Sequence, residues 1–183
     1  MQEDFPEFLT KNKSGFLRQD DGQQSPVFVS SGNITTDADI KRVEQELDVS
    51  LPQSYRQFLL ICGSGAWCDD WIPSPNELYA FDENCWEMAG FVTLVHNVEK
   101  LGDFLAINPT DLVEDGERPI YYCSHDPFGY AQIAISFEEW CRNILAGKLT
   151  GTFNIYDDVE DAVYAKWKEY RASQPKKWWH VWR

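Results

Sequence analysis

The sequence has no long apolar run and few of the signals that direct a chain to a membrane. None of its 183 residues belongs to a stretch approaching the roughly 18 apolar residues that indicate a spanning helix. The first six residues, Met-Gln-Glu-Asp-Phe-Pro, are acidic where a secretory signal is basic. With 43% apolar and 25% charged residues, the composition indicates one globular domain. We therefore expect a cytoplasmic protein that does not associate with membranes.

Basic residues are also scarce. Sixteen Lys and Arg stand against thirty Asp and Glu, which gives a net charge of −14 at neutral pH. Proteins that bind nucleic acids in general neutralise phosphates with Lys and Arg, so this balance argues against a nucleic-acid partner. It favours high solubility and a cationic partner.

Cysteine and histidine are too few and too irregularly spaced to predict a metal site. The five cysteines are an odd number and lack Cys-x-x-Cys spacing: Cys62, Cys68, Cys85, Cys123 and Cys141. Such cysteines are typical of free thiols in a reducing compartment. A zinc site built from Cys62, Cys68, Cys85 and His96 is the alternative, but its spacing matches no structural zinc module. We expect neither a metal nor a cofactor.

Motifs that carry catalysis are missing as well. Cys123, His125 and Asp126 have the residue types of a Cys–His nucleophile pair, but on a short predicted turn loop geometry would set their positions. Gly63-Ser64-Gly65 follows a predicted helix, so it is neither a nucleophile elbow nor a dinucleotide loop. There is no Gly-Lys-Ser/Thr phosphate loop and no His-Glu-x-x-His motif. We predict no catalytic residue and no enzymatic activity.

What the sequence does contain is a clear pattern of helices and strands. Thr36 and Asp39 form the pattern of a capping box before a helix over 37–47. A second helix begins at Pro52 and ends at Gly63, with apolar residues at i, i+3, i+4 and i+7 between them. These two segments predict a pair of helices in the first half of the chain.

The second half predicts a sheet followed by two more helices. Strands are predicted at 27–29, 91–95, 104–107, 120–123 and 130–135. A polar turn over 124–129 would join the last two as an antiparallel pair. The helix that follows is capped by Ser136 and ended by Gly147, and a last helix covers 158–172.

The predicted fold is α+β, with an N-terminal helix pair, a central mostly antiparallel sheet and C-terminal helices packed on it. We divide the chain into an N-terminal extension (1–33), a domain (34–149), and a C-terminal helix with a Trp-rich tail (150–183). The ends lack the strong patterning of the middle segment.

Charge is distributed unevenly along the chain. Between 57 and 117 there are twelve acidic residues and one basic residue, Lys100, and the same segment is rich in aromatic residues. One interpretation is a solvated acidic face with the aromatic rings in the core. The other is a binding surface, in which rings anchor a partner and carboxylates attract it. The candidate partner-binding residues are Trp67, Asp69, Asp70, Trp71, Glu77, Tyr79, Asp82, Glu83, Trp86 and Glu87.

Two separated blocks of sequence resemble one known family. The first is Ile40-x-x-Val43-Glu44-x-x-Leu47-x-Val49-x-Leu51-Pro52-x-x-Tyr55-Arg56-x-Phe58-Leu59. The second is Ile120-Tyr-Tyr-x-x-His125-Asp126-Pro127-Phe128-Gly129, then Ile133-Ala134-x-Ser136-Phe137-Glu138-Glu139-Trp140. In this order they resemble the opening and closing segments of the SUKH superfamily, also known from fungal cell-wall assembly regulators. The family usually has Gly where this chain has Asp48.

The resemblance implies an α+β domain without catalytic residues. Most bacterial members of the family are similar to immunity proteins, which bind and neutralise toxins, often nucleases, delivered between neighbouring cells. It thus implies a cytoplasmic immunity protein, a monomer or weak dimer, that binds a cationic toxin domain. The alternative is a regulatory scaffold that binds several signalling partners, as in the fungal relatives.

Overall fold

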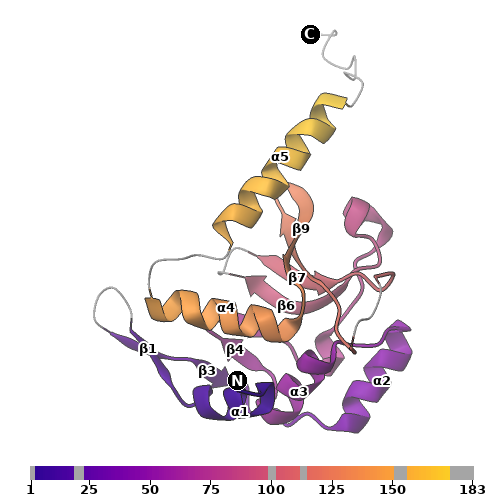
Figure 1. Cartoon of the computed structure of the whole chain (residues 1–183). Coiled ribbons are helices and arrows are strands. Elements are labelled where there is room, and N and C mark those ends of the chain that lie inside the picture. The colour runs from indigo at the N-terminus through magenta and orange to yellow at the C-terminus, as the bar shows by residue number, and fades with distance from the viewer. Residues whose placement is uncertain (1–2, 19–22, 99–101, 112–114, 151–155, 174–183) are drawn as a thin grey trace.

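The structure is a computed structural model that describes residues 3–18, 23–98, 102–111, 115–150 and 156–173 (Figure 1). These residues contain five α-helices, two short 3-10 helices, a seven-stranded sheet and a separate two-stranded ribbon. The helices lie against a sheet in which every strand pairs antiparallel with its neighbours. The predicted α+β class is confirmed.

The predicted N-terminal helix pair is present as α2 (Asp37–Leu47) and α3 (Gln53–Ile61). The capping box of α2 forms as expected, because the Asp39 amide donates to Thr36 Oγ1 while Asp39 Oδ2 accepts from the Thr36 amide. Asp48 ends α2 in the left-handed region with φ 50°, a conformation that glycine adopts at lower cost.

The sheet is a meander in which strands that follow one another in sequence are neighbours in space. Its order is β3-β4-β5-β6-β7-β8-β9. The strands are β3 (Phe28–Ser30), β4 (Gly65–Trp67), β5 (Asp70–Ile72), β6 (Val92–Val98), β7 (Asp103–Ile107), β8 (Ile120–His125) and β9 (Phe128–Ala134). The short 3-10 helices η1 (Pro75–Glu77) and η2 (Glu83–Met88) lie between β5 and β6.

All five predicted strands are found close to their expected positions, as β3, β6, β7, β8 and β9, and the turn between β8 and β9 is tighter than predicted. Ser124 and His125 belong to β8, and β9 already starts at Phe128, so only Asp126 and Pro127 connect the two strands. The peptide bond between these two residues is cis. His125 therefore stands at the end of a paired strand, where hydrogen bonding fixes its backbone.

Several elements were not predicted. They are α1 (Phe5–Asn12), the ribbon of β1 (Phe16–Arg18) and β2 (Gln24–Pro26), and the short strands β4 and β5. Asp4 caps α1 by accepting a hydrogen bond from the Glu7 amide at 2.8 Å. The buried side chains of α1 join the main core, so this part of the predicted N-terminal extension is packed onto the body of the protein.

The last two helices complete the fold. Helix α4 (Phe137–Thr150) continues through Gly147, so the prediction that this glycine ends the helix is wrong. Gly147 is buried, and a residue without a side chain suits that position. Helix α5 (Asp157–Ser173) packs on β8 and β9 with its first turns, and its later turns extend away from the body (Figure 1).

The main core lies between the sheet and helices α1, α3 and α4. Phe58 of α3 makes edge-on ring contacts with Trp67 of β4 and Phe137 of α4, with centroids 5.6 Å apart in both pairs. A second, smaller cluster forms around Met88, Phe91, Ala106 and Cys123. This second cluster supports the surface described next.

Candidate protein-binding surface

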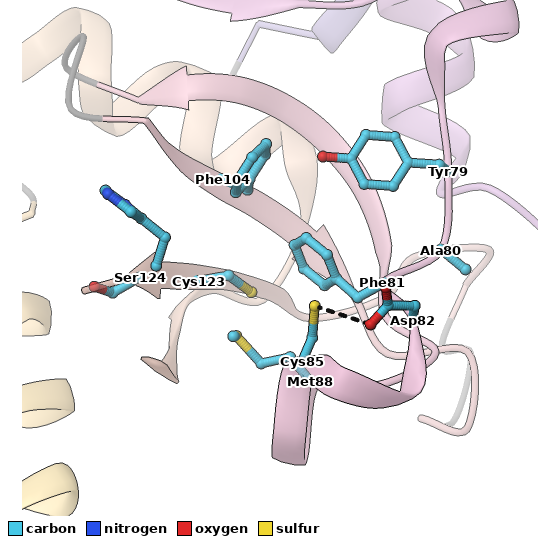
Figure 2. A pocket seen from close by; sticks show the side chains of 10 residues that line it. Tyr79, Ala80, Phe81, Asp82, Cys85, Met88, Phe104, Cys123 and Ser124 are labelled. Atoms are coloured by element: carbon cyan, nitrogen blue, oxygen red, sulfur yellow. Dashed lines mark hydrogen bonds between the residues drawn. The ribbon is translucent and has the colours of Figure 1, made fainter. Parts of the chain in front are cut away.

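A pocket of about 290 Å³ opens above the second cluster, between η2 and the strands β7 and β8 (Figure 2). Its lining residues come from three separate segments of the chain. They are Tyr79, Ala80, Phe81, Asp82, Cys85, Met88, Phe104, Cys123, Ser124 and His125. We call this site the Phe81 pocket.

Aromatic rings form one wall of the Phe81 pocket. The rings of Tyr79, Phe81 and Phe104 meet edge to face, with centroids 5.5 to 6.3 Å apart. His96 contacts Tyr79 and Phe104 from β6, and its Nε2 lies 3.2 Å from Thr93 Oγ1. Each ring is thus held by two or more others, so the wall keeps its shape without a ligand.

Sulfur atoms form much of the remaining lining. In Figure 2 the sulfur atoms of Cys85, Met88 and Cys123 gather on one side of the Phe81 ring. Burial raises the pKa of both thiols, of Cys85 and of Cys123, and the nearby Asp82 carboxylate adds to the effect at Cys85. A thiol that stays protonated is a poor nucleophile, so these cysteines contribute apolar surface rather than reactivity.

The predicted alternative of a Cys–His pair is not what the structure forms. The Cys123 thiol donates to the carbonyl oxygen of Tyr121, at 3.9 Å. His125 Nδ1 instead lies 2.7 Å from Asp103 Oδ1, and the His125 amide donates to the same oxygen at 2.9 Å. Asp103 therefore orients the imidazole ring, while the Cys123 thiol is bonded elsewhere.

Carboxylates lie along η2, the short helix that borders the Phe81 pocket. Asp82 lines the pocket, and its Oδ1 accepts from the Asn84 amide at 2.8 Å, which fixes the start of η2. Glu83 and Glu87 lie on the same short helix and are exposed. We call Asp82, Glu83 and Glu87 the η2 rim.

A second cleft, of about 480 Å³, lies on the other side of His125, between the β8–β9 turn and α5. Four carboxylates line it: Asp103, Asp126, Glu160 and Asp161. Tyr122 donates from its hydroxyl to Asp103 Oδ2 at 2.6 Å and also contacts Glu160 Oε1 at 3.3 Å. We call this site the Glu160 cleft. An apolar pocket and an acidic cleft are thus neighbours, and His125 borders both.

Two of the ten predicted partner-binding residues do not lie on the surface. Trp67 is fully buried, and its Nε1 donates to the Cys141 carbonyl of α4 at 3.4 Å. Asp70 is 1% exposed and accepts a hydrogen bond from the Tyr156 hydroxyl. Their inclusion in a binding surface is wrong, because both side chains join the sheet to the C-terminal part of the core.

Seven of the other eight predicted residues divide into two groups. Tyr79 and Asp82 line the Phe81 pocket, and Glu83 and Glu87 belong to its rim. Asp69, Trp71 and Glu77 lie elsewhere, on the β4–β5 turn, on β5 and on η1, and none of them lines the pocket. The side chain of Trp86 lies outside the described residues.

Sequence reasoning did not find the residues that complete the site. Phe81, Cys85, Met88 and Phe104 line the pocket, but they come from segments that only the β-meander brings together. Glu160 lies near the start of the predicted last helix, where acidic residues are common, so its sequence position gives no signal of a site. The alternation of Tyr79 and Phe81 about Ala80 was the one local signal of a shared face.

The described part of the chain offers neither a cluster of metal-ligating side chains nor a helix that could cross a membrane. No three His, Cys, Asp or Glu side chains there gather as a metal ion would require. Cys62, Cys68, Cys85 and His96 accordingly form no such group. None of the helices that the structure describes has both the length and the apolar character needed to cross a bilayer.

Comparison with known proteins places the chain in a family. No curated protein matches the sequence. The model of the SMI1/KNR4 family (SUKH-1) matches residues 34–143, which run from just before α2 into the first half of α4. Both pockets draw on this segment, but α5, which carries Glu160, lies beyond it. Since the match covers more than half of the chain, the protein belongs to the SMI1/KNR4 family (SUKH-1).

Proposed function

We propose that this chain is an immunity protein, which binds a toxin domain and neutralises it through the surface around the Phe81 pocket. The observation that carries the proposal is a preformed apolar pocket with an acidic rim on one side and an acidic cleft on the other. Family membership supports the proposal, because the related immunity proteins act by binding a protein partner.

The lining of the pocket suits binding better than catalysis. Its cysteine thiols have raised pKa values, and the ring of His125 is held by Asp103. Apolar pockets bordered by polar residues are where the strongest contacts of protein interfaces concentrate. Binding alone suffices for neutralisation if the partner's working surface is covered in the complex.

The charge of the chain favours a cationic toxin. A net charge of −14 and exposed carboxylates on both sides of the pocket would attract a basic domain and raise the association rate. A nuclease toxin has such a basic surface because it must hold a phosphate backbone. We therefore expect the partner to be a basic domain, with a nuclease as the leading kind.

The test is to identify the toxin and measure protection. The chain is purified from its native host with its bound partner, and the partner's toxic domain is then expressed in a sensitive strain with and without this protein. We expect one tight partner and restored growth on co-expression. Many weak partners and no protection would contradict the proposal and favour the regulatory scaffold.

A further inference from the structure

We propose that the Phe81 pocket receives one large apolar side chain, carried on a basic segment of the partner protein. This inference deepens the proposed function and rests on it. It states which chemistry the partner must present: an apolar anchor with Lys or Arg residues on both sides of it.

The size of the pocket favours a single side chain. Its volume of about 290 Å³ is just below the range of roughly 300–1,000 Å³ that sites for small molecules occupy. A cofactor-sized ligand would fill it and protrude. One aromatic or long aliphatic side chain fits, and such anchors contribute much of the binding energy in protein interfaces.

The lining determines the apolar character of the anchor. Phe81 and Phe104 offer ring surfaces, and Met88 and Cys85 offer sulfur atoms, which make favourable contacts with aromatic rings. Tyr79 is 41% exposed, so its ring is accessible from outside. An incoming ring would complete a cluster whose members already contact one another edge to face.

Charge complementarity determines what lies beside the anchor. The η2 rim supplies exposed carboxylates on one side, and the Glu160 cleft supplies Asp126, Glu160 and Asp161 on the other. Among the described residues that line either site there is no Lys or Arg. An acidic flank on the anchor would be repelled from both sides, whereas a basic flank would be attracted to both.

The preference for a basic flank depends in part on a segment of this chain that the family model does not match, because α5 contributes to the Glu160 cleft. Its outer wall comes from α5, which lies outside the residues that match the family model. The α5 wall is held close to the sheet at Gly129, where an added Cβ would lie 2.8 Å from Val163 Cγ1. The pocket thus belongs to the family segment, and the second acidic flank is added by α5.

The test uses Cys85 as a reporter inside the pocket. The full-length protein is alkylated with iodoacetamide at pH 9 over hours, because the raised pKa values of both thiols leave only a small, slowly reacting thiolate fraction. Modification of Cys85 is followed by mass spectrometry, with Cys62 at the end of α3 as the internal reference. Three synthetic peptides of equal length serve as probes at millimolar concentration. They carry a central Trp between lysines, a central Ser between lysines, and a central Trp between glutamates.

We expect the lysine-flanked Trp peptide to slow alkylation of Cys85 by about threefold or more, which corresponds to a filled pocket in about two thirds or more of the molecules. The alkylation rate of Cys62 should not change. The other two peptides should leave the rate of Cys85 unchanged. If none of the peptides slows the reaction, or all three slow it equally, the proposal is overturned.

The chain's own tail is the competing occupant, because residues 174–183 are basic and contain three tryptophans. Trp178, Trp179 and Trp182 are therefore replaced by Ser in the full-length chain. A faster alkylation of Cys85 in this variant, without any peptide, would show that the tail fills the pocket and would overturn the proposal. An unchanged rate supports an external partner.

A pocket-filling variant separates this inference from the proposed function. Cys85→Trp should weaken binding of the toxin by at least about tenfold, mainly by faster dissociation. Leu60→Trp, at an exposed position of α3, is the matched control and should bind as the wild type does. Protection of cells together with normal binding by folded Cys85→Trp would overturn the pocket assignment alone. Absence of protection by the wild type would overturn the proposed function.

Discussion

The hydroxyl of Tyr156 donates a hydrogen bond to Asp70 Oδ2 at 2.6 Å, inside the core. The same hydroxyl accepts a hydrogen bond from Trp140 Nε1 at 3.1 Å. A residue just before α5, a strand residue and an α4 residue are thus connected through one oxygen atom. Asp70 therefore holds the fold together, although its sequence neighbourhood had placed it among the partner-binding acids.

Replacing Tyr156 by Phe should destabilise the protein without touching the binding surface. The variant leaves the Trp140 indole without this acceptor and the buried Asp70 carboxylate without this donor. We expect a loss of about 2–3 kcal/mol in the free energy of unfolding, measured by urea denaturation. Tyr164→Phe, at an exposed position of α5, is the control and should change the stability by less than about 0.5 kcal/mol. Equal stability of both variants would show that the buried network contributes little.

Much of the fold was predictable because long periodic segments carry their own signal. Helix α2 was predicted with its exact capping pair, Thr36 and Asp39, since both the cap and the apolar period are local in sequence. Strands β4 and β5 were not predicted because each has only three residues. Each also contains a buried residue whose burial depends on a distant part of the chain: Trp67 of β4 bonds to α4, and Asp70 of β5 bonds to Tyr156. Contacts between distant parts of the chain therefore determine that these two segments form strands.

The binding surface was predictable only in part, for a related reason. The acidic run indicated a charged face, and Tyr79, Asp82, Glu83 and Glu87 do lie in or beside one pocket. The sequence could not show which aromatic rings are exposed, because exposure follows from the meander. It also could not show that α5 adds Glu160 from far along the chain.

Replacing Gly65 tests how closely the backbones of β3 and β4 approach each other. Its φ is 154°, and an added Cβ would lie 2.2 Å from the Val29 carbonyl oxygen and 2.9 Å from the Phe28 ring. Gly65→Ala should cost about 2–4 kcal/mol, because the backbone must move to avoid the clash. At Gly90, φ is 85° and no atom lies within 4 Å of an added Cβ, so Gly90→Ala should cost only about 1–2 kcal/mol. Urea denaturation compares them, and equal losses would contradict the close approach.

His96, behind the wall of the Phe81 pocket, should make stability depend on pH. Burial lowers the pKa of His96 below its ordinary 6.5, although the Glu77 carboxylate opposes the shift. At pH values between the lowered pKa of folded His96 and 6.5, the unfolded chain binds more protons than the folded protein. The free energy of unfolding therefore rises as pH rises through this window, and this part of the stability is lost as pH falls through it.

The matching variant is His96→Gln, which keeps a polar side chain but does not titrate there. Its free energy of unfolding should vary less between pH values below and above 6.5 than that of the wild type. Urea denaturation at a series of pH values measures the difference. Parallel pH profiles for the two proteins would show that His96 is not the group responsible.

The central claim is that this protein acts as an acidic binding surface around an apolar pocket. Its most direct test is the rate of association with the toxin domain, measured across a range of salt concentrations. The triple variant Asp82→Lys, Glu83→Lys and Glu87→Lys reverses the η2 rim. The matched control, Glu7→Lys, Glu46→Lys and Glu169→Lys, makes the same change in net charge at exposed positions on α1, α2 and α5.

We predict that reversal of the η2 rim slows association by about tenfold at low salt and flattens its salt dependence, because the attraction between the rim and the toxin is replaced by repulsion. The control should lose much less. If the rim variant and the wild type associate at the same rate with the same salt dependence, the acidic surface does not guide binding and the account is contradicted.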